Sequence, residues 1–148
     1  MRVAVALLLA GCASLQVPGQ PCGAVQVAPG VAATANHCAD KRVLWRVEGA
    51  DLAFVFMAST PKPMRILPVE SGTVATLRGR EFTVMDPLRL SDGHLFLLVT
   101  PEFEHGDSGF ELWYEGEVIG VAIGNDGARG VAVASGEIAR QLVAKAAE

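Results

Sequence analysis

The amino-acid sequence predicts an all-β body followed by one C-terminal α-helix. The chain of 148 residues contains 16 glycines and 8 prolines, which separate many short apolar stretches. Short strands bounded by turn residues are typical of a sandwich or a barrel. Only the last segment, from Ser135 onward, places apolar residues at helical spacing. Apolar residues make up 51% of the chain, enough to bury a core, so wholesale disorder is excluded.

The first eleven residues are typical of an export signal. Arg2 precedes an apolar run over residues 3–10, which is too short for a membrane-spanning helix of about 20 residues. Leu9-Ala10-Gly11-Cys12 resembles a bacterial lipobox. This resemblance implies that residues 1–11 are removed as a signal peptide and that Cys12 becomes the lipidated N-terminus.

The expected location follows from this signal. Ala13, rather than an aspartate, follows the cysteine, which by resemblance to Gram-negative lipoproteins favours the outer membrane. We therefore expect an exported cell-envelope lipoprotein, anchored through Cys12 on the periplasmic side of the outer membrane. The alternative is an ordinary signal, or a wrongly placed start codon, in which Cys12 is incidental.

Residues 12–21 are expected to form a short tether. Nine apolar stretches beyond it are predicted to be strands: residues 24–28, 43–47, 52–57, 73–77, 81–85, 95–100, 111–114, 117–123 and 130–134. Pro61, Pro63 and Pro68 cluster in the middle of the chain. They indicate a connection between two halves, residues 22–66 and residues 67–134.

The last segment is predicted to be a helix over residues 136–147. Ile138, Leu142, Val143 and Ala146 recur at helical spacing. Ser135 precedes them and is the expected N-cap.

Charge and composition exclude several functions. The formal net charge is −4, and an acidic chain lacks the basic surface that nucleic-acid binding requires. No Cys/His spacing suggests zinc, and no glycine-rich loop followed by lysine suggests a phosphate site. We therefore expect no nucleic-acid partner, no metal and no cofactor.

The three cysteines divide into an anchor and a pair. Disulfides form in oxidising compartments, so export allows Cys22 and Cys38 to pair while Cys12 carries the lipid. Two free thiols remain the alternative.

Two motifs carry the chemistry. One is Thr34-Ala35-Asn36-His37-Cys38, and the other is His105-Gly106-Asp107-Ser108-Gly109. A serine hydroxyl becomes a nucleophile only when a base removes its proton. Glycines around it allow a sharp turn that aims backbone N–H groups at a developing oxyanion. The second motif alone is equally compatible with an exposed turn.

Together the motifs resemble those of the chymotrypsin/trypsin-like serine proteases. In that family a Thr-Ala-Ala-His-Cys segment carries the base, a cysteine sixteen residues earlier forms a disulfide, and Gly-Asp-Ser-Gly carries the nucleophile. Here Cys22 lies sixteen residues before Cys38, and Asn36 replaces one alanine. Phe110 and Glu111 replace the usual Gly and Pro. The resemblance implies a protease domain over residues 22–148, built as a trimmed double β-barrel, with a protein or peptide substrate.

The resemblance also implies a role for each site residue. Asp51 begins an apolar strand, as the family's triad aspartate does, and His37, Asp51 and Ser108 follow the family's chain order. Ser108 is then the nucleophile, His37 the general base, and Asp51 the group that orients the imidazole. The backbone N–H groups of Gly106 and Ser108 are expected to form the oxyanion hole.

Other candidates for these roles fit the pattern less well. Asp40 lies too near His37 in sequence to fold back onto it, and Asp86 and Asp92 lie in turn-like contexts. His94 and His105 are alternative bases without the flanking motif.

The resemblance further implies the substrate-binding residues. Gly124 corresponds to the glycine that pairs with substrate backbone, and Gly130 begins the opposite pocket wall. Glu102, six residues before Ser108, corresponds to the pocket floor, where an acidic group favours Lys or Arg in the substrate. His105 is the alternative, as a group that binds an acidic side chain.

The chain departs from the family at the activation terminus. It has no Ile-Val-Gly-Gly segment, so Asp107 lacks its familiar ion-pair partner, and we expect other contacts to order the oxyanion loop. Two other functions stay open: a catalytically inactive protease-fold lipoprotein that binds partners, and a structural envelope lipoprotein with accidental motifs.

Overall fold

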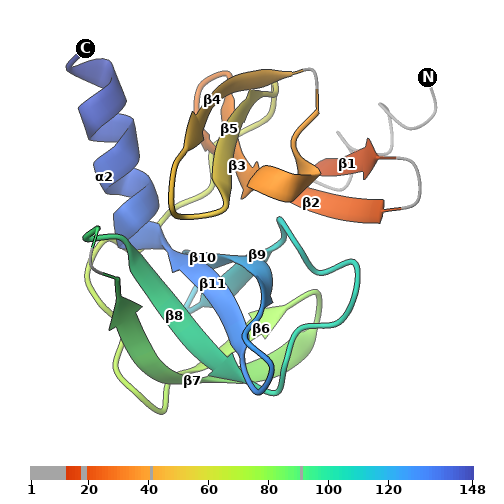
Figure 1. The fold of residues 1–148 in the computed structure, drawn as a ribbon, viewed down its shortest axis with the longest axis vertical. Coiled ribbons are helices and arrows are strands. Elements are labelled where there is room, and N and C mark those ends of the chain that lie inside the picture. The colour runs from red at the N-terminus through yellow and green to blue at the C-terminus, as the bar shows by residue number, and fades with distance from the viewer. Residues whose placement is uncertain (1–12, 18–19, 41, 91) are drawn as a thin grey trace.

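The structure, a computed structural model, describes residues 13–17, 20–40, 42–90 and 92–148. The chain folds into two β units followed by a helix, α2 (Ser135–Ala146). Figure 1 shows α2 leaving the second unit and running beside the first.

The first unit is a five-stranded sheet in the order β1-β2-β3-β5-β4. Its elements are β1 (Ala13–Val17), β2 (Gln20–Ala28), β3 (Val31–Ala35), the short 3-10 helix η1 (Asn36–Cys38), β4 (Val43–Val47) and β5 (Leu52–Phe56). All the neighbouring strands pair antiparallel.

The second unit is a closed barrel in the order β10-β11-β8-β7-β6-β9. Its strands are β6 (Val74–Leu77), β7 (Arg80–Arg89), β8 (Leu95–Thr100), β9 (Glu111–Tyr114), β10 (Glu117–Asn125) and β11 (Gly130–Ala134). The predicted all-β class with a C-terminal helix is confirmed. The first half, however, is a sheet in its hydrogen bonding rather than a second closed barrel.

Two strands were not anticipated by the sequence pattern. The expected tether, residues 12–21, contains β1, which pairs with β2 from Val17↔Gln20 to Ala13↔Ala24. The other is β3, which is buried over nearly its whole length. A strand rich in alanine and buried on both faces has neither alternation nor strong β propensity, so its pairing with β2 and β5 defines it.

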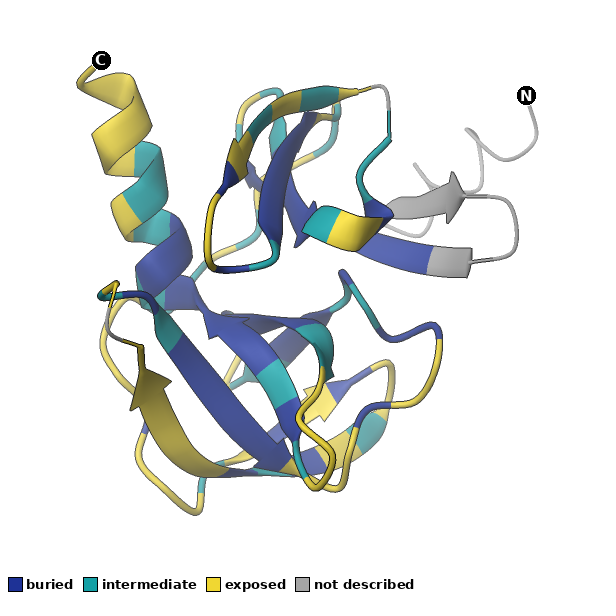
Figure 2. Ribbon diagram, in the orientation of Figure 1, coloured by how far each residue is buried: buried dark blue, intermediate teal, exposed yellow. Residues whose placement is uncertain are grey.

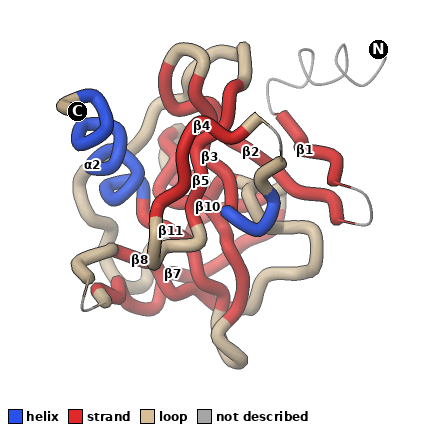
Figure 3. The backbone as a smooth tube through the Cα atoms, turned by 45° about the horizontal axis from the view of Figure 1, so that its top comes forward, coloured by secondary structure: helices blue, strands red, loops and turns tan. Residues whose placement is uncertain are grey.

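A shared core fixes the two units against each other. Leu52 and Phe54 from the first sheet pack in one buried cluster with Val121 and Val133 of the barrel and Ile138 of α2. Figure 2 shows these facing strands as buried, and the tilted view in Figure 3 shows β10 passing beside β3. Each fully buried side chain of this kind contributes about 1.5–3 kcal/mol, so the interface holds the site's two halves in register.

The helix begins one residue before the predicted start. Ala134, not Ser135, is the N-cap residue, and it makes no side-chain cap. The Ser135 hydroxyl instead donates to the carbonyl oxygen of Arg65, in the connection between the two units. This connection lies along β10, where Met64 forms a bridge with Val118. Ser135 therefore ties the helix to the linker rather than capping it.

The predicted signal peptide, residues 1–11, and the predicted lipidation site, Cys12, lie outside the described residues. Among the helices that the structure describes, none is both long and apolar enough to cross a membrane.

Candidate active site

His37 and Asp51 meet because the strands that carry them are neighbours. β3 leads into η1, which holds His37, and the turn that holds Asp51 leads into β5. Ala35 pairs with Leu52 in this ladder, so the two residues lie at the same edge. The Nδ1 of His37 is 2.8 Å from Oδ2 of Asp51, and the His37 backbone amide donates to Oδ1 at 3.1 Å. The carboxylate thus orients both the ring and the backbone of His37.

This pair is open to solvent. The side chains of His37 and Asp51 are 44% and 37% exposed. They are fourteen positions apart in the chain, and β4 is the one strand that the structure describes between them. Asp40, the nearby alternative, is held by Arg42: hydrogen bonds donated by the guanidinium lower the pKa of Asp40. Its carboxylate makes no hydrogen bond to His37 in the described part of the chain.

Ser108 is held between the two units. Its carbonyl oxygen accepts a bond from the Gly23 amide at 2.8 Å, and the next amide, Gly109, donates to Ala122 of β10 at 2.7 Å. Gly109 has φ +86°, and a Cβ there would overlap the carbonyl oxygen of Gly23. Only glycine permits this approach, so the motif docks the serine turn against both β2 and β10.

The replacement of the family's Gly by Phe110 is accommodated locally. A Cβ on Gly23 would lie 2.5 Å from the Phe110 ring, so the absence of a side chain at Gly23 makes room for the ring. The Arg78 guanidinium covers the ring, 4.3 Å from its centroid.

Cys22 and Cys38 form a disulfide with Cα atoms 5.9 Å apart. It joins β2 to η1, directly after His37 and directly before Gly23. Because Gly23 binds the Ser108 carbonyl, the bridge links the histidine segment to the strand that supports the serine.

Asp107 has a charged partner that the sequence motif did not reveal. Its side chain is 1% exposed, and it forms an ion pair with Arg80, with Arg78 at 3.8 Å. The Glu104 amide donates to its other oxygen at 2.7 Å. Arg78 and Arg80 flank the β6–β7 turn, and Arg78 also donates to the Gly106 carbonyl at 3.3 Å. Two arginines therefore brace the loop between Glu104 and Ser108, where the family uses a new N-terminus.

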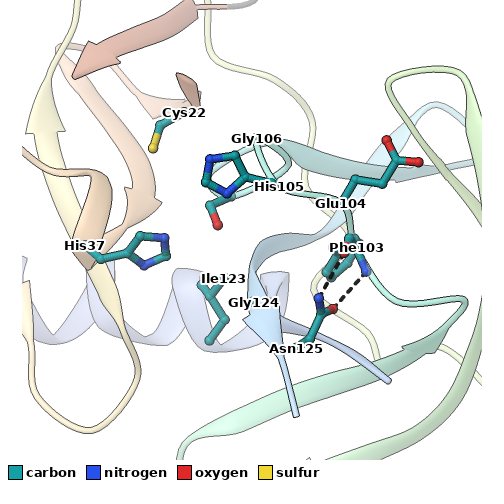
Figure 4. A pocket seen from close by; sticks show the side chains of 10 residues that line it. Cys22, His37, Phe103, Glu104, His105, Gly106, Ile123, Gly124 and Asn125 are labelled. Carbon is teal, nitrogen blue, oxygen red and sulfur yellow. Dashed lines mark hydrogen bonds between the residues drawn. The ribbon is translucent and has the colours of Figure 1, made fainter. Parts of the chain in front are cut away.

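His37 and Ser108 line one cleft of about 340 Å³. The other lining residues are Cys22, Phe103, Glu104, His105, Gly106, Ile123, Gly124 and Asn125, and Figure 4 shows His37 at one end and Asn125 at the other. Within the described chain, no hydrogen bond joins the Ser108 hydroxyl to His37, and the amides of Gly106 and Ser108 donate none. Two residues that line the cleft beside His37 therefore have backbone N–H groups without a hydrogen bond in the described chain.

The expected substrate-binding residues separate into two groups. Gly124 lines the cleft, as does His105. Gly130 does not: it is buried, and a Cβ on it would lie 2.8 Å from the Phe103 ring. Glu102 is exposed and does not line the cleft. The ring of the neighbouring residue, Phe103, fills the space beneath the loop, where the resemblance implies an acidic floor.

Sequence reasoning missed Arg80 and Asn125. Arg80 stands in an Arg-Gly-Arg turn, and Asn125 follows Gly124 at the end of a pocket strand. The sequence around each residue does not indicate its partner, since both side chains bind the loop before Ser108, more than twenty residues away in the chain. His94 serves elsewhere, bonded to Glu137 of α2. No group of three or more His, Cys, Asp or Glu side chains among the described residues is arranged to hold a metal.

The two β units, the cleft between them and the helix define the chymotrypsin-like serine protease fold. Solved structures agree. Rv3671c from Mycobacterium tuberculosis, as a serine-to-alanine mutant in its inactive form, matches with a TM-score of 0.76 at 19% identity, over 97% of this chain and 90% of that chain. Thermobifida fusca protease A matches with a TM-score of 0.65 at 18% identity, over 90% and 93%.

An inactivated protease paralogue of the scabies mite also matches, with a TM-score of 0.64 at 18% identity, over 88% of this chain and 91% of that chain. At these identities the likeness shows the fold, which Rv3671c in its active form and the inactivated paralogue share. The resemblance that the motifs predict is confirmed at this level. No protein-family model and no curated protein matches the chain.

Proposed function

We propose that this protein is a serine endopeptidase that hydrolyses peptide bonds with Ser108, His37 and Asp51. The observation that carries the proposal is the shared cleft. A histidine oriented by a carboxylate lines it together with Ser108 and Gly106, whose backbone N–H groups make no hydrogen bond to any described residue.

The reaction follows from these groups. Ser108 Oγ attacks the scissile carbonyl carbon while Nε2 of His37 takes its proton, and Asp51 stabilises the resulting imidazolium. The amides of Gly106 and Ser108 donate to the tetrahedral oxyanion. His37 then gives the proton to the leaving amine as the C–N bond breaks. Water, activated by the same histidine, releases the acyl group. The Ser108–His37 hydrogen bond forms as substrate closes the cleft, since such bonds tighten in the bound complex.

Covalent labelling tests this proposal. Folded, oxidised protein is expected to react with a fluorophosphonate probe, and Ser108→Ala abolishes the reaction. Ser71→Ala is the matched control, because Ser71 is exposed and its hydroxyl bonds the Met85 carbonyl. His37→Ala is expected to reduce labelling as strongly as Ser108→Ala. Labelling that persists in both variants contradicts the triad.

An inactive binding protein is the second candidate. The missing Ser108–His37 hydrogen bond and the match to an inactivated paralogue favour it. On this alternative, the folded protein binds peptides in the cleft but neither labels nor hydrolyses them.

We also propose that the protein is exported and anchored through a lipid on Cys12. The lipobox-like segment supports this, as does the Cys22–Cys38 disulfide, because such bonds persist in oxidising compartments. Intact mass spectrometry of the protein from a bacterial envelope is expected to show acyl mass that is lost in Cys12→Ser. Unmodified mass in both proteins contradicts the anchor.

A further inference from the structure

One end of the cleft is closed by a side chain acting as a cross-link. The Asn125 amide nitrogen donates to the Phe103 carbonyl at 2.9 Å, and its amide oxygen accepts from the Phe103 N–H at 2.8 Å. Asn125 ends β10, and Phe103 lies in the loop that leads to Ser108. A paired strand would satisfy the same two backbone groups, so this side chain joins the two walls of the cleft where no ladder does.

Packed side chains fill the space beneath the cross-link. Phe103 is 6% exposed, and its ring centroid lies 5.0 Å from that of Phe82. Gly130 approaches it so closely that a Cβ would lie 2.8 Å away. A substrate side chain that enters from Ser108 therefore meets a closed end rather than a channel into the barrel.

The closed end carries no fixed charge. Phe103, Ile123, Gly124 and Asn125 line it. Glu102 lies outside the cleft, and Asp107 is buried against Arg80. Of the titratable lining residues, Glu104 points away from this end in Figure 4, and its side chain is largely exposed. A charged substrate side chain would lose its hydration here without gaining an ion pair, which is strongly unfavourable.

We propose that Asn125 determines specificity by closing this pocket, and that the site takes peptides with a small apolar side chain before the cleaved bond. This inference rests on the proposed function. The Asn125 cross-link and the buried Phe103 ring end the pocket a short way from Ser108, which leaves room for a side chain such as that of alanine or valine. Aromatic, basic and acidic side chains are excluded by size or by charge.

Fluorogenic peptides that differ only at this position test the proposal. Wild type is expected to favour alanine or valine over phenylalanine, lysine and glutamate by at least about tenfold in kcat/KM, the scale of discrimination that pocket contacts provide. Asn125→Ala removes the cross-link and is expected to raise the phenylalanine-to-alanine ratio about tenfold or more. The neighbouring Asp126→Ala is the control, since Asp126 pairs with Arg129 and does not line the cleft.

A second variant gives a gain of function. Asn125→Asp keeps the shape but cannot donate to the Phe103 carbonyl, and it places a carboxylate at the pocket end. Cleavage after lysine or arginine is expected to rise at least about tenfold relative to alanine, by charge pairing. A misfolded variant cannot produce this increase. Unchanged ratios in both variants, or a wild-type preference for glutamate that His105→Ala removes, overturn the proposal.

Binding separates this proposal from the proposed function. The Ser108→Ala variant binds peptides without cleaving them, so fluorescence anisotropy on it reports pocket preference alone. If wild type neither labels nor hydrolyses but Ser108→Ala still prefers alanine peptides, the protease function fails and the pocket assignment stands. Equal binding of alanine and phenylalanine peptides overturns the assignment whatever the activity.

Discussion

At the scale of single residues, the orientation of His37 rests on one carboxylate. Asp51 accepts from the ring at 2.8 Å and from the amide at 3.1 Å. An asparagine there could present its NH₂ group to the ring and favour the wrong tautomer. Asp51→Asn is therefore expected to lower kcat by roughly 10⁴-fold with the fold intact. Asp40→Asn is the control, because Asp40 pairs with Arg42. Pre-steady-state acylation rates are measured for both variants. Equal rates for Asp51→Asn and wild type contradict the role of Asp51 in orienting His37.

The glycine that follows Ser108 is required for two reasons that can be separated. At Gly109 a Cβ would overlap the Gly23 carbonyl, whereas at Gly116, with φ +78°, it would meet nothing within 4 Å. Both alanine substitutions incur the left-handed backbone cost of about 1–2 kcal/mol. Only Gly109→Ala adds a clash, so it is expected to destabilise the protein by more than Gly116→Ala. The urea midpoints of the two variants measure this difference. An equal loss of stability in both would show that the structure relaxes around the Gly109 clash without cost.

The residues that the sequence could identify are those with local motifs. His37, Ser108 and Asp51 stand in recognisable segments, and the structure brings His37 to Asp51 and into one cleft with Ser108. Arg80 and Asn125 could not be found in this way. Their roles depend on which backbone or carboxylate the fold places opposite them, and a single sequence does not record that pairing.

At the scale of elements, the β6–β7 turn supplies charge to the serine loop. Asp107 is buried, and removing its main counter-ion leaves a carboxylate with reduced compensation. Arg80→Gln is expected to lower the free energy of unfolding by about 1–3 kcal/mol and to reduce kcat/KM by disordering Gly106. Arg89→Gln, on the same strand but with its guanidinium on the Gly93 carbonyl, is the control. Thermal unfolding and peptide hydrolysis measure the two effects. Full activity in Arg80→Gln contradicts the bracing role.

Elements were predictable where burial has one simple pattern. The strands β4, β8, β9 and β11 have the predicted bounds, because polar turn residues flank short β-rich stretches. β3 was missed since alanines buried on both faces show no alternation. The helix start shifted because the Ser135 hydroxyl donates a hydrogen bond to the carbonyl oxygen of Arg65, which is distant in sequence. Long-range pairing decided each of these exceptions.

At the scale of the whole molecule, one polar cluster joins three segments that do not line the cleft. His94, in the β7–β8 turn, bonds Glu137 of α2 through Nδ1 and the Glu48 carbonyl through Nε2, each at 2.8 Å. Glu48 begins the turn that ends at Asp51. The cluster therefore connects the helix to the turn that carries Asp51, across the interface between the two units.

The stability that this cluster provides depends on pH through the carboxylate of Glu137. Its side chain is 1% exposed. Burial by itself would raise its pKa, but hydrogen bonds from Gln141, His94, Arg140 and the Leu95 amide outweigh it and hold the pKa below the ordinary value of about 4.5. A lowered native pKa means that the unfolded state binds the proton more tightly. The carboxylate thus stabilises the fold fully above about pH 4.5, and this stabilisation is lost as the pH falls through the lowered value.

Glu137→Gln tests this linkage. The variant is expected to be less stable than wild type at neutral pH by about 1–3 kcal/mol, because charge-assisted bonds to His94 and Arg140 are lost. The difference is expected to shrink as the pH falls below about 4.5 toward the lowered pKa of Glu137, where wild type also loses its carboxylate. Urea unfolding across this pH range measures it, with the exposed Glu81→Gln as control. A difference that stays constant with pH would mean that Glu137 stabilises the fold by its shape and not by its charge.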